Sequence, residues 1–335
     1  MQEKMDKLLL EYPLEDYQRH SRIHPLPSFS SEHAKVFVKR EDELGSLSIG
    51  CKMRKYLSLI PFLIAGEREV AIVGSAFSNN ILGLCLLLKE KHVPFTLFLN
   101  RTSHTPVQGN FFFTLLTLKP HQIIWIEPGT DIQELQSQYE TILQKSFIWV
   151  PIGSVCKEAL PGSLTLPLDI LKNQQDKRLS FKNIFIDAGT GFNAATLLLG
   201  LGYLDMKAKV YIVQVAGSDL DFPNMLGKCA LFFKELYLEN PSPASFELLR
   251  PHKARSFGSI STEHIEFIKE MAESEGVLLD PIYNAKLFAT AKATILEKQL
   301  SGDTLIIHSG GSLSLSGFVS YFDMLNEIVM DTESS

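Results

Sequence analysis

Short apolar runs alternate with longer amphipathic segments along most of the chain. The apolar runs are typical of buried strands and lie at residues 35–41, 68–74, 94–100, 122–127, 146–151, 182–191, 208–217 and 303–311. The longer segments predict helices at residues 51–65, 79–92, 109–118, 131–145, 192–205, 263–276 and 285–300. Pro61 is expected to bend or interrupt the first helix, and Asp131 to cap the fourth. Strands alternating with helices predict parallel sheets covered on both faces, and therefore an α/β fold.

A turn-rich stretch, "PIGSVCKEALPGSLTLPLD", occupies residues 151–169. Clustered Gly, Pro and Ser between periodic segments indicate a connection rather than a further strand. We expect the chain to pass from one sheet to another near residues 150–170. The pattern thus predicts two parallel-sheet domains.

The composition is that of a globular protein, with 45% hydrophobic and 21% charged residues. A formal net charge of −6 argues against nucleic acid as a main partner and gives no reason to expect a membrane surface. The longest apolar run, residues 81–88, is too short to cross a bilayer. The N-terminus is too acidic for a signal peptide, and the four cysteines lack metal-ligand spacing, so we expect a cytoplasmic protein without a metal site.

Three stretches rich in small polar residues follow strands: "VGSAFSNN", "DAGTGFNAA" and "HSGGSLSLSG". Ligands bind outside the carboxyl ends of strands in parallel sheets, so the three stretches are expected to face one crevice. In the second, backbone N–H groups of Gly189, Thr190, Gly191 and Asn193 precede a helix and would suit a phosphate. The same letters fit the dinucleotide fingerprint GxGxxA, although Asp219 is a late candidate for its acidic residue, and a plain tight turn is a further alternative.

Other candidates have ordinary structural alternatives. Ser78 and Asn79 lie where a helix begins, so they could cap it or bind a small carboxylate. Tyr283 and His308 could simply be packed in the core. Cys51, beside two cations, could be an activated thiolate. The cluster "GCKMRK" at residues 50–55 is less easily explained, because lysines at a helix N-terminus oppose the helix dipole.

Six motifs in order resemble the family of pyridoxal-phosphate (PLP) enzymes that contains 1-aminocyclopropane-1-carboxylate (ACC) deaminase and D-cysteine desulfhydrase. They are "VKRED", "GCKMRK", "FSNN", "AGTGFN", "DPIY" and "HSGG", and the resemblance covers residues 36 to about 318. It implies a fold-type II, tryptophan synthase beta-like architecture of two domains. Residues 1–55 and 160–335 would form the large PLP-binding domain and residues 56–159 the small domain, with the active site in the cleft between them and a homodimer as the assembly.

The resemblance also implies site roles. Lys52 would form the Schiff base with PLP, its charge disfavoured by neighbouring Arg54 and Lys55. Ser78 would hold the substrate carboxylate and act with Lys52 and Tyr283 in catalysis. The remaining cofactor contacts would come from Asn79 at the ring hydroxyl, Ser309 at the pyridine nitrogen, and Gly189, Thr190, Gly191, Phe192 and Asn193 at the phosphate. A neutral hydroxyl at Ser309 would not enforce protonation of that nitrogen. The substrate shell would comprise Ser78, Asn79, Asn80, Phe257 and Asn284.

Two positions favour one branch of this family. ACC deaminases typically carry Glu and Leu where this chain has Asn284 and Ser309, and small polar residues there resemble the desulfhydrase branch. The expected reaction is α,β-elimination from a D-amino acid such as D-cysteine, giving pyruvate, ammonia and sulfide. Departures from the family pattern occur at Cys51, Phe77, Asn80 and Phe257, the last losing a tyrosine hydroxyl. Alternatives are therefore an ACC deaminase giving 2-oxobutanoate and ammonia, a non-catalytic PLP-binding or metabolite-sensing relative, and a nucleotide-binding oxidoreductase.

Overall fold

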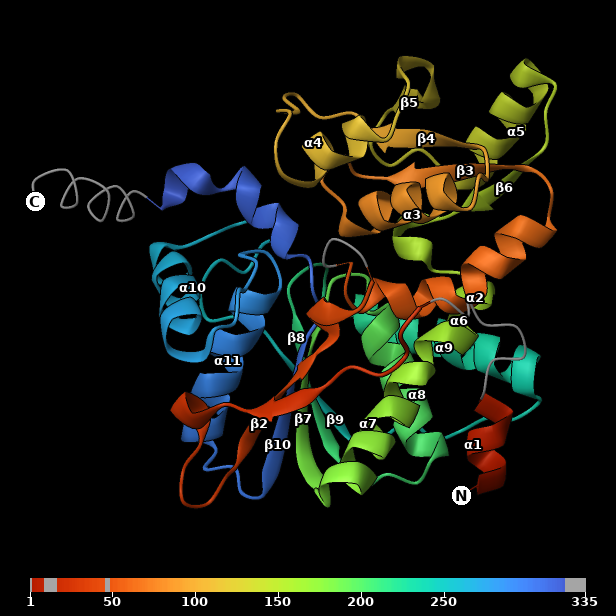
Figure 1. The fold of residues 1–335 in the computed structure, drawn as a ribbon. Helices are drawn as coiled ribbons and strands as arrows, with labels where there is room; N and C mark the ends of the chain where they lie inside the picture. The colour runs from red at the N-terminus through yellow and green to blue at the C-terminus, as the bar shows by residue number, and fades with distance from the viewer. Residues whose placement is uncertain (1, 9–16, 46–48, 323–335) are drawn as a thin grey trace, which may run out of the picture.

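The molecule contains two separate sheets, which lie one above the other in the view of the computed structural model in Figure 1. The structure describes residues 2–8, 17–45 and 49–322. The larger sheet has the strand order β1-β2-β10-β7-β8-β9, in which only β1 is antiparallel to its neighbour. Its strands are β1 (Ile23–Pro25), β2 (Val36–Arg40), β7 (Phe181–Ala188), β8 (Lys209–Gln214), β9 (Phe246–Leu249) and β10 (Asp303–His308).

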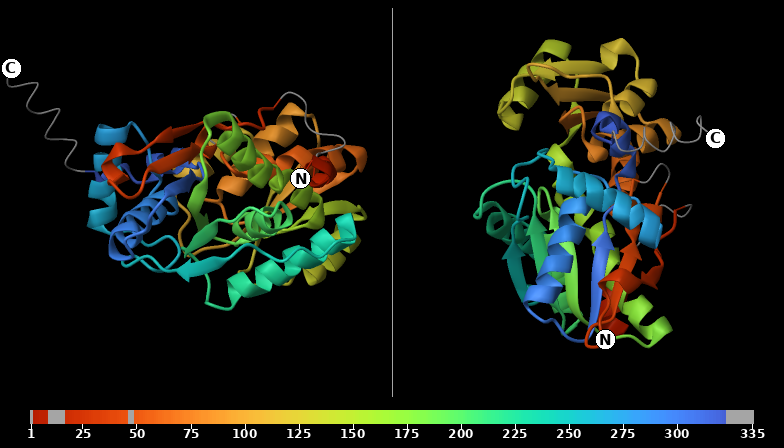
Figure 2. Two further views of the ribbon diagram at one scale, coloured as in Figure 1. Left: turned by 90° about the horizontal axis from the view of Figure 1, so that it is seen from below. Right: turned by 90° about the vertical axis from the view of Figure 1, so that its left-hand side faces the viewer.

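The smaller sheet is formed by one continuous stretch of chain and is parallel throughout, in the order β5-β4-β3-β6. Its strands are β3 (Glu69–Gly74), β4 (Phe95–Asn100), β5 (Ile123–Ile126) and β6 (Phe147–Val150). The right-hand view in Figure 2 shows the smaller sheet and its helices as a separate lobe above the larger one. The predicted α/β fold with two parallel-sheet units is confirmed.

Helices cover both faces of each sheet, because the central strands are apolar on both sides. On the larger sheet, α10 (Thr262–Glu275) and α11 (Asn284–Glu297) pack on one face. The other face carries α7 (Thr165–Lys177), α8 (Phe192–Tyr203) and α9 (Asp221–Tyr237). The smaller lobe carries α3 (Asn79–Glu90), α4 (Gly109–Leu116) and α5 (Ile132–Leu143), and α1 (Gln2–Leu8) lies against α7.

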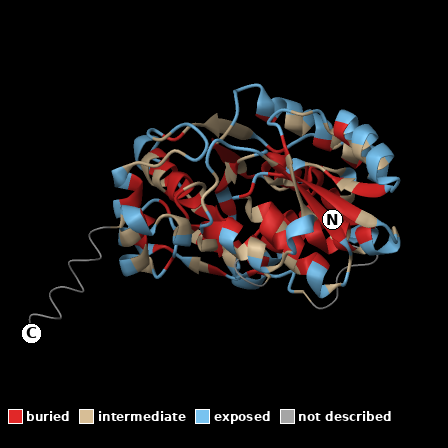
Figure 3. Cartoon of the chain, turned by 90° about the horizontal axis from the view of Figure 1, so that it is seen from above, coloured by how far each residue is buried: buried red, intermediate tan, exposed pale blue. Residues whose placement is uncertain are grey.

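The two lobes share one hydrophobic core, which runs through α2 (Lys52–Ala65) and α6 (Leu160–Ser163) between them. Tyr56, Leu57 and Ile60 of α2 are fully buried there. Figure 3 shows the buried strands and inner helix faces enclosed by exposed outer faces. Helix α2 is therefore held from both sides, which fixes the position of its first residue, Lys52.

Three sequence expectations need correction. Helix α2 runs without interruption through Pro61. The chain does pass between the sheets after Val150, but much of the turn-rich stretch is helical, in the 3₁₀ turn Lys157–Ala159, α6 and α7. Helix α9 and strand β9 were not predicted at all. Asp131 caps α5 as expected, accepting from the N–H groups of Gln133 and Glu134.

Candidate active site

The start of α2 is joined to the loops after two strands of the larger sheet. The N–H of Cys51 donates to the carbonyl of Ser309, which follows β10, over 3.1 Å. The Asn193 amide, at the start of α8, donates to the Cys51 sulfur over 2.9 Å. Burial raises the pKa of the Cys51 thiol, so the alternative of an activated thiolate finds no support.

Gly50 makes this junction possible. Its φ is +71°, and a Cβ there would overlap the Ser309 carbonyl oxygen and lie 2.7 Å from the Gly310 Cα. Only glycine combines that backbone conformation with that approach. Lys52 is thereby brought to the carboxyl edge of the larger sheet.

Lys52 and Tyr283 lie next to each other at the carboxyl edge of the larger sheet, and the region between this edge and the loop that carries Asn79 is called the crevice below. The Lys52 Nζ lies 5.4 Å from the centre of the Tyr283 ring. The same ring packs on Gly189, where a Cβ would lie 2.9 Å from Tyr283 Cε1, and contacts the Phe257 ring at 5.9 Å between centres. Four predicted site residues from four different segments are thus brought together.

The three cations of "GCKMRK" have different surroundings. Arg54 is buried and paired with Glu41 and Asp169, and Lys39 completes this cluster with a 2.6 Å bond to Asp169. The two cations offset the cost of burying Asp169 and lower the pKa of its carboxyl to about 2. Two carboxylates thus neutralise Arg54 within this buried cluster.

Lys55 lies behind the predicted phosphate loop. Its Nζ donates to the carbonyl of Gly153 over 2.9 Å and lies 4.8 Å from the centre of the Phe192 ring. Burial lowers the pKa of this lysine to about 8. When protonated, Lys55 adds positive potential to the N-terminal end of α8. From the sequence alone, Lys55 had no expected role beyond its closeness to Lys52.

The loop Gly189–Gly191, the predicted anion cradle, connects β7 to α8. Gly191 has a φ of +81°, and a Cβ there would lie 3.0 Å from Phe222. Thr190 is exposed, while Phe192 is buried as the first residue of α8. A side chain at Gly189 or Gly191 would therefore crowd the entry to α8, whose first N–H groups have no partner within the helix.

From the smaller lobe, the loop after β3 reaches the same region. Ser78 caps α3, its hydroxyl accepting from the N–H groups of Asn80 and Ile81, so the capping interpretation holds. Asn79 packs on Gly311, and its Oδ1 accepts a 2.7 Å bond from the buried Asn110 of α4. Asn110 is a site residue that sequence reasoning missed, because only the fold brings α4 next to Asn79.

Asn80 differs from its neighbours because its side chain is buried. Its Oδ1 accepts from the hydroxyls of Tyr56 and Ser154, at 3.1 and 3.0 Å. These bonds connect α3 to α2 and to the turn after β6. The structure therefore gives Asn80 a packing role, and its predicted substrate contact stays a prediction.

Asn284 and Ser309 are joined by hydrogen bonds. The Ser309 N–H donates to Asn284 Oδ1 over 2.9 Å, and the Ser309 hydroxyl lies 3.4 Å from the same oxygen. Asn284 Nδ2 donates to Asp280 Oδ1 and to the Gly310 carbonyl. His308, by contrast, is a buried core residue that bonds the Leu278 carbonyl. Asn284 therefore fixes the glycine loop after β10.

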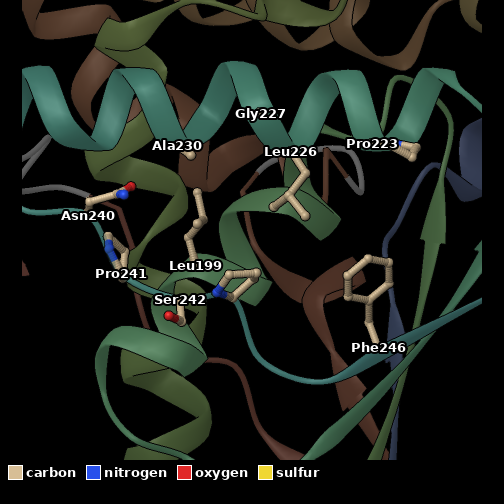
Figure 4. A pocket seen from close by; sticks show the side chains of 10 residues that line it. Leu199, Pro223, Leu226, Gly227, Ala230, Asn240, Pro241, Ser242 and Phe246 are labelled. Atoms are coloured by element: carbon tan, nitrogen blue, oxygen red, sulfur yellow. The ribbon is translucent and has the colours of Figure 1, made fainter.

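A separate pocket of about 400 Å³ lies between α8, α9 and the segment before β9 (Figure 4). Its lining is apolar or neutral, including Leu199, Leu226 and Phe246. It offers no ionisable side chain for chemistry. The crevice at Lys52 is the better candidate on that ground.

Comparison with known proteins identifies the family. The chain belongs to the pyridoxal-phosphate dependent enzymes, whose family model matches residues 14–310, and its cofactor is pyridoxal phosphate. A crystal structure of an ACC deaminase homologue is 24% identical, with a TM-score of 0.81, and the match covers 98% of this chain and 99% of the other. Threonine deaminase isoform 2 of Solanum lycopersicum is 14% identical, with a TM-score of 0.65 and coverage of 96% and 88%.

A hydrogen sulfide-producing enzyme of Fusobacterium nucleatum is 13% identical, with a TM-score of 0.60 and coverage of 87% and 94%. At these identities the likeness shows the fold alone, which is that of fold-type II PLP enzymes. Within the described ranges, no helix has the length and apolar character needed to cross a membrane.

Proposed function

We propose that the protein is a PLP-dependent lyase that eliminates a β-substituent from a small D-amino acid, with D-cysteine as the expected substrate. The products would be pyruvate, ammonia and sulfide. The observation that carries the proposal is Lys52, held against Tyr283 beside the Gly189–Gly191 cradle.

The residues of the crevice suit the cofactor's parts. The cradle and the N-terminus of α8 would hold its phosphate, with the charge of Lys55 behind them. Asn79, steadied by Asn110, would meet the ring hydroxyl, and Ser309 the ring nitrogen. When bound, the cofactor supplies an electron sink for bond cleavage at the substrate Cα.

The chain's own residues would then position the substrate and move protons. Ser78, at the N-terminus of α3, would hold the substrate carboxylate. The amine of Lys52 would remove the Cα proton as a general base. A thiolate leaving group departs readily, so elimination needs little further acid catalysis. Residues 1–55 with 160–335, and 56–159, would be the two domains of a cytoplasmic homodimer, as family resemblance suggests.

Two alternatives remain testable. The ACC deaminase homologue among the similar structures supports ACC as a second substrate candidate. Phe257, 58% exposed beside Tyr283, removes a hydroxyl from the crevice and supports a non-catalytic PLP-binding relative.

Borohydride reduction of the PLP-loaded protein tests the attachment. Peptide mapping should find the pyridoxyl group on Lys52, and Lys52→Ala should lose it. Lys172→Ala, at an exposed lysine of α7, is the matched control and should keep it. A label on another lysine would overturn the assignment.

A further inference from the structure

Asp187 is an acid of intermediate exposure whose Oδ1 is buried, and the function proposed for the crevice gives it no role. It is the penultimate residue of β7, directly before the cradle loop. Among the described residues, its Oδ1 is enclosed by protein and accepts no hydrogen bond. An unpaired buried carboxylate oxygen is costly, so its presence in the crevice calls for a function.

The electrostatic environment of Asp187 is set by groups from three segments. They are Cys51 and Lys52 at the start of α2, Ser309 in the loop after β10, and Asp280 and Tyr283 before α11. Burial raises the pKa of Asp187 and Asp280 adds to the rise, while the Lys52 ammonium and hydrogen bonding by Ser309 oppose it. Burial and Asp280 thus favour the protonated form of the Asp187 carboxyl.

Ser309 is oriented to pass that proton on. Asn284 Nδ2 is occupied by two acceptors, the Asp280 carboxylate and the Gly310 carbonyl, which fixes the amide so that its oxygen faces Ser309. The Asn284 oxygen accepts from the Ser309 N–H at 2.9 Å, and the Ser309 hydroxyl, 3.4 Å from the same oxygen, would turn its proton to the ring nitrogen instead. The Ser309 oxygen keeps lone pairs that can accept from a protonated Asp187.

We propose that Asp187 is a positioning residue that acts through Ser309 on the ring nitrogen of pyridoxal phosphate. This inference rests on the proposed function, in which Ser309 faces that nitrogen. The Asp187 O–H gives its proton to the Ser309 oxygen as the Ser309 hydroxyl gives its own to the nitrogen. The result is a carboxylate and a pyridinium, with no change of oxidation state. Sequence analysis predicted that the neutral Ser309 hydroxyl would not enforce protonation of the nitrogen. With Asp187 behind it, Ser309 would instead transmit a proton to that nitrogen.

The test compares two ligands that differ in one atom. Pyridoxal phosphate and its 1-deaza analogue, which has carbon in place of the ring nitrogen, are bound to the apoprotein and measured by equilibrium dialysis. Asp187→Asn should weaken binding of pyridoxal phosphate about tenfold or more, the effect of losing a charge-assisted hydrogen bond, and leave the analogue unchanged. Asp219→Asn, at an 87% exposed side chain, is the matched control.

Ser309→Ala should show the same ligand dependence, and the double variant should lose no more than either single one, because both act on one atom. If Asp187→Asn does not fold, Ser309→Ala carries the comparison alone. Equal weakening for both ligands, or no weakening for either, would overturn the relay while leaving attachment to Lys52 standing. Failure of the wild-type protein to bind pyridoxal phosphate would overturn the proposed function and the relay together.

Discussion

The N–H of Cys51 and the carbonyl of Ser309 are joined by a 3.1 Å hydrogen bond, so the helix that begins with Lys52 is fastened to the loop after the last strand. This bond requires the backbone at Gly50 to lie almost against Ser309 and Gly310. The position of the lysine thus depends on a residue with no side chain.

Gly50→Ala should lower the free energy of unfolding by more than the roughly 1–2 kcal/mol that a left-handed backbone costs an alanine, because a clash is added. Urea unfolding would measure it. Gly129→Ala is the control, since Gly129 has a φ of +82° but has open space around it. Equal losses in the two variants would contradict the close approach as the cause.

The cradle should depend on backbone shape more than on the threonine side chain. Thr190→Ala should weaken binding of pyridoxal phosphate by about 1 kcal/mol, the contribution of one neutral hydrogen bond. Gly189→Val should abolish it, because even a Cβ would lie 2.9 Å from Tyr283. Equilibrium dialysis measures the binding of both variants. Gly227→Val, at an exposed position of α9, is the control for added bulk. Similar mild effects at 189 and 190 would argue against the cradle.

Lys55 should impose a pH dependence on stability. Its pKa is lowered to about 8 in the folded protein, against about 10.4 in the unfolded chain, so the unfolded chain binds more protons between these values. The free energy of unfolding should therefore gain roughly 3 kcal/mol as the pH rises through that window.

The variant Lys55→Met should lack this gain, and Lys172→Met, which removes an exposed lysine, should keep it. Urea unfolding at pH 7, 8, 9 and 10 would give the curves. Parallel curves for Lys55→Met and the wild type would show that the buried amine does not titrate in this window.

The choice of substrate and the turnover rate should depend on Phe257, which lacks a tyrosine hydroxyl. D-Cysteine should yield pyruvate slowly and ACC should yield no 2-oxobutanoate. Phe257→Tyr should raise the rate, because a general acid–base group typically contributes about 10²- to 10⁴-fold. Product assays by coupled dehydrogenase would follow both, with Phe112→Tyr, another exposed phenylalanine, as control. Rapid turnover of ACC would reverse the choice between the two reactions.

Strands β2–β8 and β10 were predictable because each is a short apolar run between turns, whereas β1 and β9 were missed. Helix α9 was not, since Pro223 and Gly227 interrupt its pattern and it buries only Phe222, Cys229 and Phe233. The turn-rich stretch misled because Pro161 and Pro167 resemble breaks but lie in the first turns of helices, where proline is tolerated.

The site divides in the same way. Lys52 and the cradle belong to local motifs, whose residues are adjacent in the sequence and can be found there. Asp187, although it begins the stretch "DAGTGFNAA", and Asn110 could not be singled out from the sequence, because their interactions are with Ser309 and Asn79, which lie far away along the chain. Pairing of that kind is a property of the folded sheet and leaves no spacing in the sequence.

Strand β10, placed between β2 and β7, has a consequence for biosynthesis. The smaller sheet is made from residues 69–150 and can assemble while the chain is still being translated. The larger sheet has to keep a gap at its centre until residues 303–308 leave the ribosome, since non-local pairing waits for the last partner. Ser309 follows directly, so closing the sheet and completing the crevice are one event. A chain stalled on the ribosome before that point would have a folded smaller lobe and an incomplete larger sheet. Such a chain would be bound by chaperones and would have no activity.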